Sequence, residues 1–164
     1  WGCIFCKTGT EANVVEQAKQ FDGIRQAFFA RQWQHCSKNG VRDVQIRSMI
    51  PGYVFFGANQ ELDTAKLARG DDVLSVLSYD GDWRLRANDL QFARWLAQSE
   101  GVIGMSEVHR VGDQIEIVSG PLRQLRGLIT KIDRHNRNGQ VEIHFDGRSI
   151  RIWLAFEYIS EVRN

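Results

Sequence analysis

Two cysteines near the start of the chain, Cys3 and Cys6, have the Cys-x-x-Cys spacing of zinc and redox sites. His35 and Cys36 are the residues that would complete a set of four zinc ligands. However, the segment that contains the first two cysteines reads as a short strand, and strand positions three apart point to opposite faces. One metal ion cannot easily bind both thiolates, so the sequence favours buried or edge cysteines without metal or redox chemistry.

The other residue types that carry catalysis are scattered along the chain. None of the four histidines lies in a signature that links it to a nucleophile or to paired carboxylates. The glycines do not form a phosphate-binding loop. His135, between Arg134 and Arg137, is typical of an RNA contact or a plain loop residue rather than a general base. We therefore predict that the protein is not an enzyme and that it needs no cofactor and no metal.

The stretch 49–56 is the feature around which the first part of the chain is organised. It begins with a Pro-Gly pair, which marks the entry to a strand. Alternation then puts Tyr53 and Phe55 on one face and Val54 and Phe56 on the other. A strand that is apolar on both faces is either the centre of a covered sheet or a half-covered strand whose second face docks a partner. In the second case Tyr53 and Phe55 belong to a binding patch.

Composition sets broad limits on the class of protein. The 164 residues are 43% hydrophobic and 25% charged with a net charge of +1, which fits one medium globular domain or two small ones. No apolar run reaches the length of a membrane span, and no basic and apolar leader precedes Trp1. The odd number of cysteines, three, is typical of a reducing compartment. These features predict a cytoplasmic protein without membrane contact.

The first two-thirds of the chain predict an antiparallel sheet with helices packed on it. Thr8 and Glu11 have the spacing of a capping box at the start of a helix. An Asn-Gly pair at 39–40 predicts a hairpin turn between the apolar runs on either side. Apolar periodicity predicts helices over 10–21, 62–69 and 88–98, and strands over 1–6, 24–36, 41–46, 53–56, 73–79 and 83–85.

The last third has a different character, and the change defines the predicted domains. Periodicity is lost after the third helix, so we predict a first domain at 1–104, a short linker at 105–109 and a second domain at 110–164. Short alternating strands at tight spacing predict a small all-β barrel, and the fold class is α+β. The strands are expected over 114–118, 128–132, 141–145 and 149–154, with a thin core of Ile115, Ile117, Leu128, Ile132, Val141, Ile143, Phe145 and Ile152.

Motifs in both parts resemble one known family. In the last third, a series of short segments with a Gly-Pro turn and a following glycine resembles the KOW motif. Upstream segments resemble the N-terminal (NGN) domain of NusG-type transcription elongation factors, and the two matches in this order cover nearly the whole chain. The KOW-like segments are Gly112-Asp113, Ile117, Gly120-Pro121-Leu122, Arg126-Gly127-Leu128-Ile129 and Ile132-Asp133; the NGN-like ones are Trp1, 8–11 and 50–55.

Other segments are similar to LoaP-type antiterminators, a specialised branch of the NusG family. The resemblance implies a bacterial factor that binds RNA polymerase and suppresses termination, that is, processive antitermination. It also implies a monomer with an NGN-like domain followed by a KOW domain. The segments that carry this similarity are 6–11, 89–93, 101–106 and 120–122.

The resemblance further implies where the polymerase binds. In the family, an apolar patch of the first domain grips the clamp helices of RNA polymerase. Carried over by position, Phe5, Tyr53 and Phe55 supply this patch. Asn13 stands where another specialised paralogue has an assisting arginine, which leaves that polar contact open. The hairpin tip 37–40 and the segment 62–69 are the parts that would approach the polymerase lobe or the non-template DNA.

For LoaP-type proteins the resemblance implies that the barrel recognises a structured RNA hairpin in a leader. The charge pattern is compatible, because basic side chains at turns can reach phosphates or base edges, although the same arginines could belong to an ordinary solvated loop. From 108 to the end, nine basic and seven acidic residues leave only +2, which favours shape reading over tight nonspecific binding. The candidate RNA-binding residues are Arg123, Arg126, Lys131, Arg134, His135, Arg137, Arg148 and Arg151.

A second function fits the same resemblance. A transcription-translation coupling protein would use its KOW domain to bind a ribosomal protein or a termination factor rather than RNA. Arginine-bearing turns favour RNA, whereas an exposed apolar strand face on the barrel would favour protein.

Overall fold

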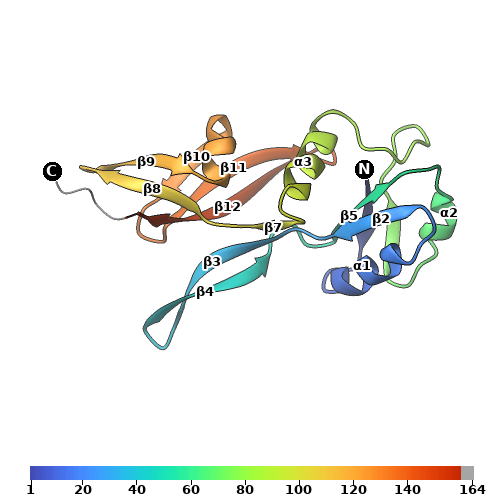
Figure 1. Ribbon diagram of the computed structural model, residues 1–164, viewed down its shortest axis with the longest axis horizontal. Coiled ribbons are helices and arrows are strands. Elements are labelled where there is room, and N and C mark those ends of the chain that lie inside the picture. Colours follow the sequence, from blue (N-terminus) through green and yellow to red (C-terminus); the bar gives the residue numbers. More distant parts are fainter. Residues whose placement is uncertain (160–164) are drawn as a thin grey trace. The chain divides into compact units, whose positions relative to one another are not determined.

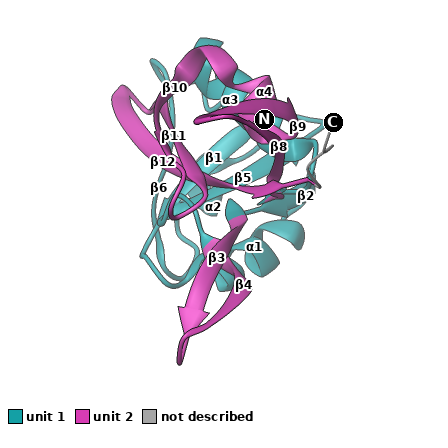
Figure 2. Ribbon diagram, turned by 90° about the vertical axis from the view of Figure 1, so that its left-hand side faces the viewer, with its two compact units in different colours: residues 1–31, 48–102 teal, residues 32–47, 103–164 magenta. Residues whose placement is uncertain are grey.

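The computed structural model describes residues 1–159, in two compact units. The first unit contains residues 1–31 and 48–102, and the second contains residues 32–47 together with the chain from 103 onward (Figure 2). The strands form sheets and the helices lie in the connections between them, so the predicted α+β class is confirmed (Figure 1). The predicted division into domains 1–104 and 110–164 would assign residues 32–47 to the first domain, and it stays a prediction.

The first unit is built on a four-stranded antiparallel sheet in the order β2-β5-β1-β6. The stretch beginning with Pro-Gly therefore lies at the centre of the sheet, between the first strand and β2. The strands are β1 (Gly2–Cys6), β2 (Ile24–Phe28), β5 (Tyr53–Ala58) and β6 (Val73–Val76), and the helices are α1 (Glu11–Lys19), α2 (Thr64–Leu67) and α3 (Ala87–Ala97).

Helix α1 covers one face of this sheet. Its apolar residues recur at the spacing of one helical face, so they are buried together against the strands while the rest of the helix is solvated. Burial of these aliphatic side chains supplies much of the free energy that holds the helix on the sheet. The cluster contains Val14, Val15 and Ala18 of α1, Ile4 and Cys6 of β1, and Val54 and Phe56 of β5.

The start of α1 differs from the predicted capping box. The helix begins at Glu11 with Thr10 as its N-cap, and no side chain caps it. The Thr10 hydroxyl donates to the carbonyl of Lys7 at 2.6 Å, while the Glu11 carboxylate accepts from the Gly9 amide at 2.9 Å. The prediction was therefore right that Glu11 satisfies a free amide, and wrong that the Thr8 hydroxyl takes part.

Strands β3 (Arg31–Lys38) and β4 (Val41–Ser48) form a hairpin, and β7 (Val102–Ile103) makes the sheet order β4-β3-β7. Asn39 and Gly40 both have positive φ, 54° and 77°, as a two-residue type I′ turn requires. The predicted Asn-Gly turn is confirmed. The single run expected over 24–36 is instead divided between β2 and β3, and β2 pairs with β5.

The second unit contains a five-stranded sheet in the order β10-β11-β12-β8-β9. Strand β8 covers most of the predicted linker 105–109, pairing antiparallel with β9 and, over three residues, parallel with β12. Two short helical segments, also not predicted, join β9 to β10. The elements are β8 (Ser106–Val111), β9 (Gln114–Ser119), α4 (Pro121–Gln124), η1 (Arg126–Leu128), β10 (Ile129–Asp133), β11 (Asn138–Phe145) and β12 (Arg148–Tyr158).

The core of the second unit lies under β11 and β12. Four of the predicted core residues, Val141, Ile143, Phe145 and Ile152, are buried. Leu128 and Ile132 were expected in the core but are 44% and 38% exposed, because they lie in η1 and on the edge strand β10. Their places are taken by residues of β8, α4 and the end of β12, namely Val108, Leu122, Leu154 and Phe156. Within residues 1–159 no helix has the length and apolar character that crossing a membrane would need.

Candidate functional sites

Phe5 and Tyr53 are directly opposite each other on neighbouring strands of the first unit. Their ring centroids are 5.4 Å apart with a tilted geometry, a favourable arrangement for an aromatic pair. Phe5 is 37% exposed, whereas Tyr53 is only 3% exposed. The structure thus brings two of the predicted polymerase-binding residues together, and Phe5 is the one that solvent reaches.

The prediction that Tyr53 and Phe55 are displayed on an open sheet face is wrong. Phe55 is 0% exposed. Its ring lies 5.9 Å from that of Phe28 on β2 and 6.0 Å from that of Phe92 on α3. Helix α3 therefore covers this face just as α1 covers the other, so β5 is the centre of a sheet covered on both sides. The apolar spacing of α3 was visible in the sequence, but the face on which it packs was not.

Asn13, the remaining residue predicted to contact the polymerase, is exposed on α1. That helix packs on the face of the sheet that contains Val54 and Phe56. Phe5 belongs to the opposite face, because it alternates along β1 with Ile4 and Cys6. Asn13 therefore does not extend the Phe5–Tyr53 pair into one patch.

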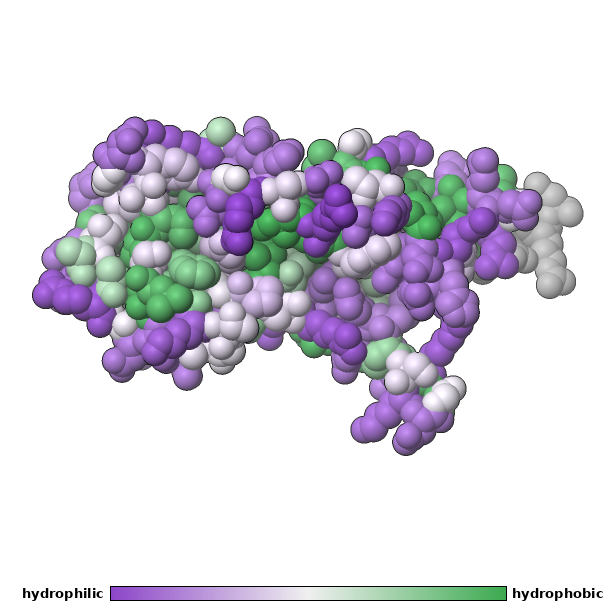
Figure 3. Space-filling model, turned by 180° about the vertical axis from the view of Figure 1, so that it is seen from behind, coloured by the Kyte–Doolittle hydropathy of each residue, from purple (hydrophilic) through white to green (hydrophobic). Residues whose placement is uncertain are grey.

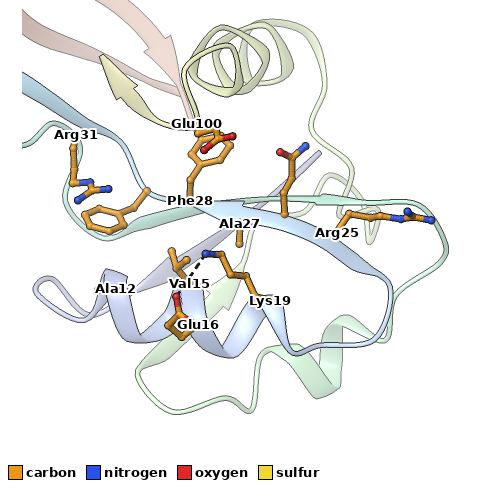
Figure 4. A pocket seen from close by; sticks show the side chains of 11 residues that line it. Ala12, Val15, Glu16, Lys19, Arg25, Ala27, Phe28, Arg31 and Glu100 are labelled. Atoms are coloured by element: carbon orange, nitrogen blue, oxygen red, sulfur yellow. Dashed lines mark ion pairs between the residues drawn. The ribbon is translucent and has the colours of Figure 1, made fainter. Parts of the chain in front are cut away.

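A groove that was not predicted lies between α1 and β2, with a volume of about 630 Å³ (Figure 4). Val15 and Ala27 are buried at its base, while Lys19 and Arg25 are exposed at its rim. Lys19 is held 3.6 Å from Glu16 in an exposed ion pair that contributes little stability. The groove carries charges of both signs, since Glu16 and Glu100 line it with three basic residues, so it offers no strong preference for an anion or a cation.

The cysteines lie as the strand argument predicted. Cys3 pairs with Phe55 in the β1–β5 register, whereas Cys6 belongs to the cluster under α1. Burial raises the pKa of the Cys6 thiol, and a protonated thiol is a poor metal ligand and a poor nucleophile. Over residues 1–159, no three His, Cys, Asp or Glu side chains gather in an arrangement able to hold a metal ion.

Most of the predicted RNA-binding side chains are exposed in the second unit, but they do not form one patch. Lys131 and Arg151 lie on β10 and β12, on the sheet face that also carries Gln140 and Glu142 of β11. The others occupy three separate connections. Arg123 and Arg126 are in the α4–η1 segment, Arg134, His135 and Arg137 are in the β10–β11 turn, and Arg148 follows the β11–β12 turn.

Several contacts order these side chains. The Arg123 guanidinium donates to the carbonyl of Val118 at 2.6 Å, which keeps it beside β9. Arg137 is only half exposed, and its guanidinium carbon lies 5.5 Å from the centroid of the Tyr158 ring, within cation–π range. Cross-strand pairing puts Arg151 opposite Glu142, which offsets part of the positive charge on that sheet face.

The β10–β11 turn is closed by Asp133. Its carboxylate accepts from the backbone amide of Asn136 at 3.0 Å and from the side-chain amide at 2.8 Å. These bonds to the charged form hold the pKa of Asp133 below its usual value. Asp133 therefore stays ionised, and its carboxylate is committed to the turn.

The hairpin of β3 and β4 also contributes to the second unit, which sequence reasoning missed. The Gln34 side chain donates to the carbonyl of Trp153 at 3.1 Å. His35 Nε2 lies 2.8 Å from the carbonyl oxygen of Phe156, and because a carbonyl only accepts, Nε2 is the donor. Side chains of β3 thus bond to the backbone of β12, about 120 residues away in sequence.

Comparison with known proteins gives one near-full-length similarity. The chain is 23% identical over 179 aligned residues to a protein of Thermus thermophilus named transcription termination/antitermination protein NusG. The alignment covers 97% of this chain and 96% of that protein. No family model matches the chain.

Proposed function

We propose that this chain is a transcription elongation factor of the NusG type. The observation that supports the proposal is the similarity to a NusG protein, which extends over 97% of this chain and 96% of the relative. It agrees with the resemblance of the segments around the Pro-Gly turn and of the KOW-like turns in the last third. In this proposal the protein is a non-enzymatic, cytoplasmic factor, with an NGN-like domain followed by a KOW domain.

The proposed partner of the first domain is RNA polymerase, through its clamp helices. Phe5 is the residue best suited to this contact, because its ring is accessible and rests on the ring of Tyr53. A large apolar side chain that is fixed by its neighbours loses little further entropy on binding. Tyr53 and Phe55 then act as buried support rather than as contacts.

The proposed outcome of polymerase binding is suppression of termination, with the second domain contacting a structured leader RNA, as in a LoaP-type antiterminator. Exposed basic side chains on three connections of the second unit support an RNA partner. Their modest net charge and wide spacing favour recognition of a folded RNA over binding to any strand.

One observation favours the coupling protein as the second candidate function. Leu128 and Ile132, at the edge of the five-stranded sheet, expose apolar surface that a ribosomal protein or termination factor could cover. Phosphate contacts would not need these side chains. If the partner is a protein, Leu128→Ser should weaken binding by the second domain more than Arg126→Gln does. If the partner is RNA, Arg126→Gln should have the larger effect.

The proposal is tested with the full chain and purified core RNA polymerase. Co-elution on a sizing column is expected for the native protein, and a gel shift with a structured RNA leader is expected to exceed that with a scrambled RNA of equal length. Absence of co-elution would remove the elongation-factor assignment. If the protein co-elutes with polymerase but binds the structured and the scrambled RNA with equal affinity, the elongation-factor assignment stands and the coupling protein is favoured.

A further inference from the structure

The strongest site outside those already described is a cleft of about 430 Å³ in the second unit. Two segments that are far apart in sequence form it. The hairpin supplies His35, Cys36, Ser37, Gly40 and Arg42, and the β10–β11 turn supplies His135, Asn136, Arg137 and Asn138. Its volume lies within the range of small-ligand sites, so a single nucleotide unit fits.

Basic and amide side chains make up most of this lining. It contains two guanidinium groups, Arg42 and Arg137, two imidazoles, His35 and His135, and no carboxylate. Among residues 1–159, neither arginine forms an ion pair with an acidic side chain. The acid beside the turn, Asp133, has both oxygens bonded to Asn136. The cleft is therefore a concave surface of positive charge, which attracts anions.

Two residues of the lining are held in place before any ligand arrives. His35 is fixed by its bond to the Phe156 carbonyl at 2.8 Å. Arg137 has a φ of 56°, its carbonyl accepts from the Phe156 amide at 2.9 Å, and its guanidinium lies over the Tyr158 ring. Arg110 lies 4.7 Å from the same ring, so Tyr158 is flanked by two cations. Prior ordering reduces the entropy that ligand binding must overcome.

We propose that this cleft binds a backbone phosphate of RNA, with Arg42 and Arg137 as its principal ligands. Guanidinium groups match phosphate oxygens in charge and in bidentate geometry, which an ordinary solvated loop would not provide. The inference rests on the proposed RNA-binding function and deepens it, because it assigns the RNA contact jointly to the hairpin and the β10–β11 turn. In this proposal, the basic side chains of the α4–η1 segment and of the β11–β12 turn orient the RNA that is bound at the cleft.

Nuclear magnetic resonance on the full-length protein tests the site without any substitution. Titration with inorganic phosphate, and separately with uridine 5′-monophosphate, is expected to shift backbone amide resonances of both the hairpin tip and the β10–β11 turn. Shifts confined to one segment, or spread evenly over all basic residues, would overturn the proposal.

Matched variants test the role in RNA binding. Arg42→Gln and Arg137→Gln are each expected to weaken binding of a short RNA stem-loop about tenfold and to lower the slope of affinity against salt by about 0.7. Lys38→Gln and Arg134→Gln remove the same charge from the same two segments without touching the cleft, and smaller losses are expected. Equal losses in all four variants would contradict a defined site.

The outcomes separate this inference from the function on which it rests. If the native chain binds the stem-loop but Arg42→Gln binds equally well, the cleft is wrong and RNA binding stands. If the native chain binds no RNA at all, both are wrong, even when co-elution with polymerase persists. Binding of a DNA stem-loop of the same sequence is measured as well. Stronger binding of the DNA than of the RNA would overturn the assignment to RNA.

Discussion

Glu11 and Gly52 are joined by a buried hydrogen bond, in which a carboxylate oxygen of Glu11 accepts from the Gly52 amide at 2.8 Å. The other carboxylate oxygen accepts from the Gly9 amide. The first residue of α1 thus connects the turn before its own helix to the turn that opens the central strand β5. This arrangement fixes the start of β5, and with it Tyr53, relative to α1.

Removal of the Glu11 carboxylate is expected to destabilise the first unit. Glu11→Ala leaves the buried Gly52 amide without a partner, which costs about 1–3 kcal/mol. Glu11→Gln keeps one acceptor oxygen and is expected to cost less. Glu16→Gln, on the same helix, breaks only an exposed ion pair and serves as the control. Urea unfolding followed by circular dichroism measures all three, and equal loss in Glu11→Ala and Glu16→Gln would contradict the role of Glu11.

Gly120→Ala is expected to be among the most damaging small substitutions in the second unit. Gly120 has a φ of 93°, and an added Cβ would lie 2.7 Å from the Cα of Ser106. Ser106 is buried and its hydroxyl accepts from the Leu122 amide at 2.9 Å, so it cannot move freely. Strain and crowding together cost roughly 2 kcal/mol or more.

Gly112→Ala provides the matched comparison for that substitution. Gly112 also has a positive φ, 60°, but nothing lies within 4 Å of an added Cβ. Only the left-handed backbone is penalised there, at about 1 kcal/mol. Thermal melting of both variants should therefore give a clearly lower midpoint for Gly120→Ala, and similar midpoints would argue against the close approach of Gly120 to β8.

Asp82 makes the stability of the first unit depend on pH in the acid range. Hydrogen bonds from the Arg84 amide, and from the side chains of Arg86 and Arg84, lower the pKa of Asp82 from 3.8 to about 2. Because the folded pKa is the lower one, the stabilising contribution is complete above pH 3.8 and is lost as pH falls to about 2.

Asp82→Asn is accordingly expected to flatten the dependence of unfolding free energy on pH between these two values. The effect is small, because Asp82 and both arginines are at the surface. Thermal melts of the native protein and of Asp82→Asn across this interval provide the measurement. An identical slope of unfolding free energy against pH in the two proteins would show that the neighbouring arginines do not stabilise the ionised form of Asp82.

Local patterns were sufficient to predict the central elements of the first unit. Alternation around the Pro-Gly pair predicted β5, and apolar spacing predicted α1 and α3, because these signals lie within one element. The Asn39-Gly40 turn was predictable for the same reason. The sequence did not predict which face of β5 each helix covers, since that depends on chain connections that no single element encodes.

Elements held by distant partners were missed. Strand β8 has a short, mostly polar sequence, and it is stabilised by pairing with β9 and with the end of β12. The cleft escaped notice because His35 and Arg42 are about 100 residues from His135 and Arg137. The available signal was a hairpin that carries His35, Lys38 and Arg42, but only the fold brings it beside the β10–β11 turn.

Phe5 and Phe55 are expected to differ sharply when each is replaced. Phe5→Ala removes a ring that is partly in solvent, so it should leave the fold intact and weaken binding to core RNA polymerase at least fivefold. Phe55→Ala empties a fully buried site between Phe28 and Phe92 and should cost about 3–5 kcal/mol of stability. Leu74→Ala, another exposed apolar side chain, is the binding control. Retained polymerase binding by folded Phe5→Ala would remove Phe5 from the contact.

Readthrough of an intrinsic terminator in a single-round transcription assay tests the proposed function most directly. The assay uses purified polymerase, the full-length protein, and templates with and without a candidate structured leader upstream of the terminator. We predict that the protein raises readthrough on the template with the leader, and raises it less on the template without it. Unchanged termination on both templates, under conditions where a known NusG-type factor acts, would contradict the proposal.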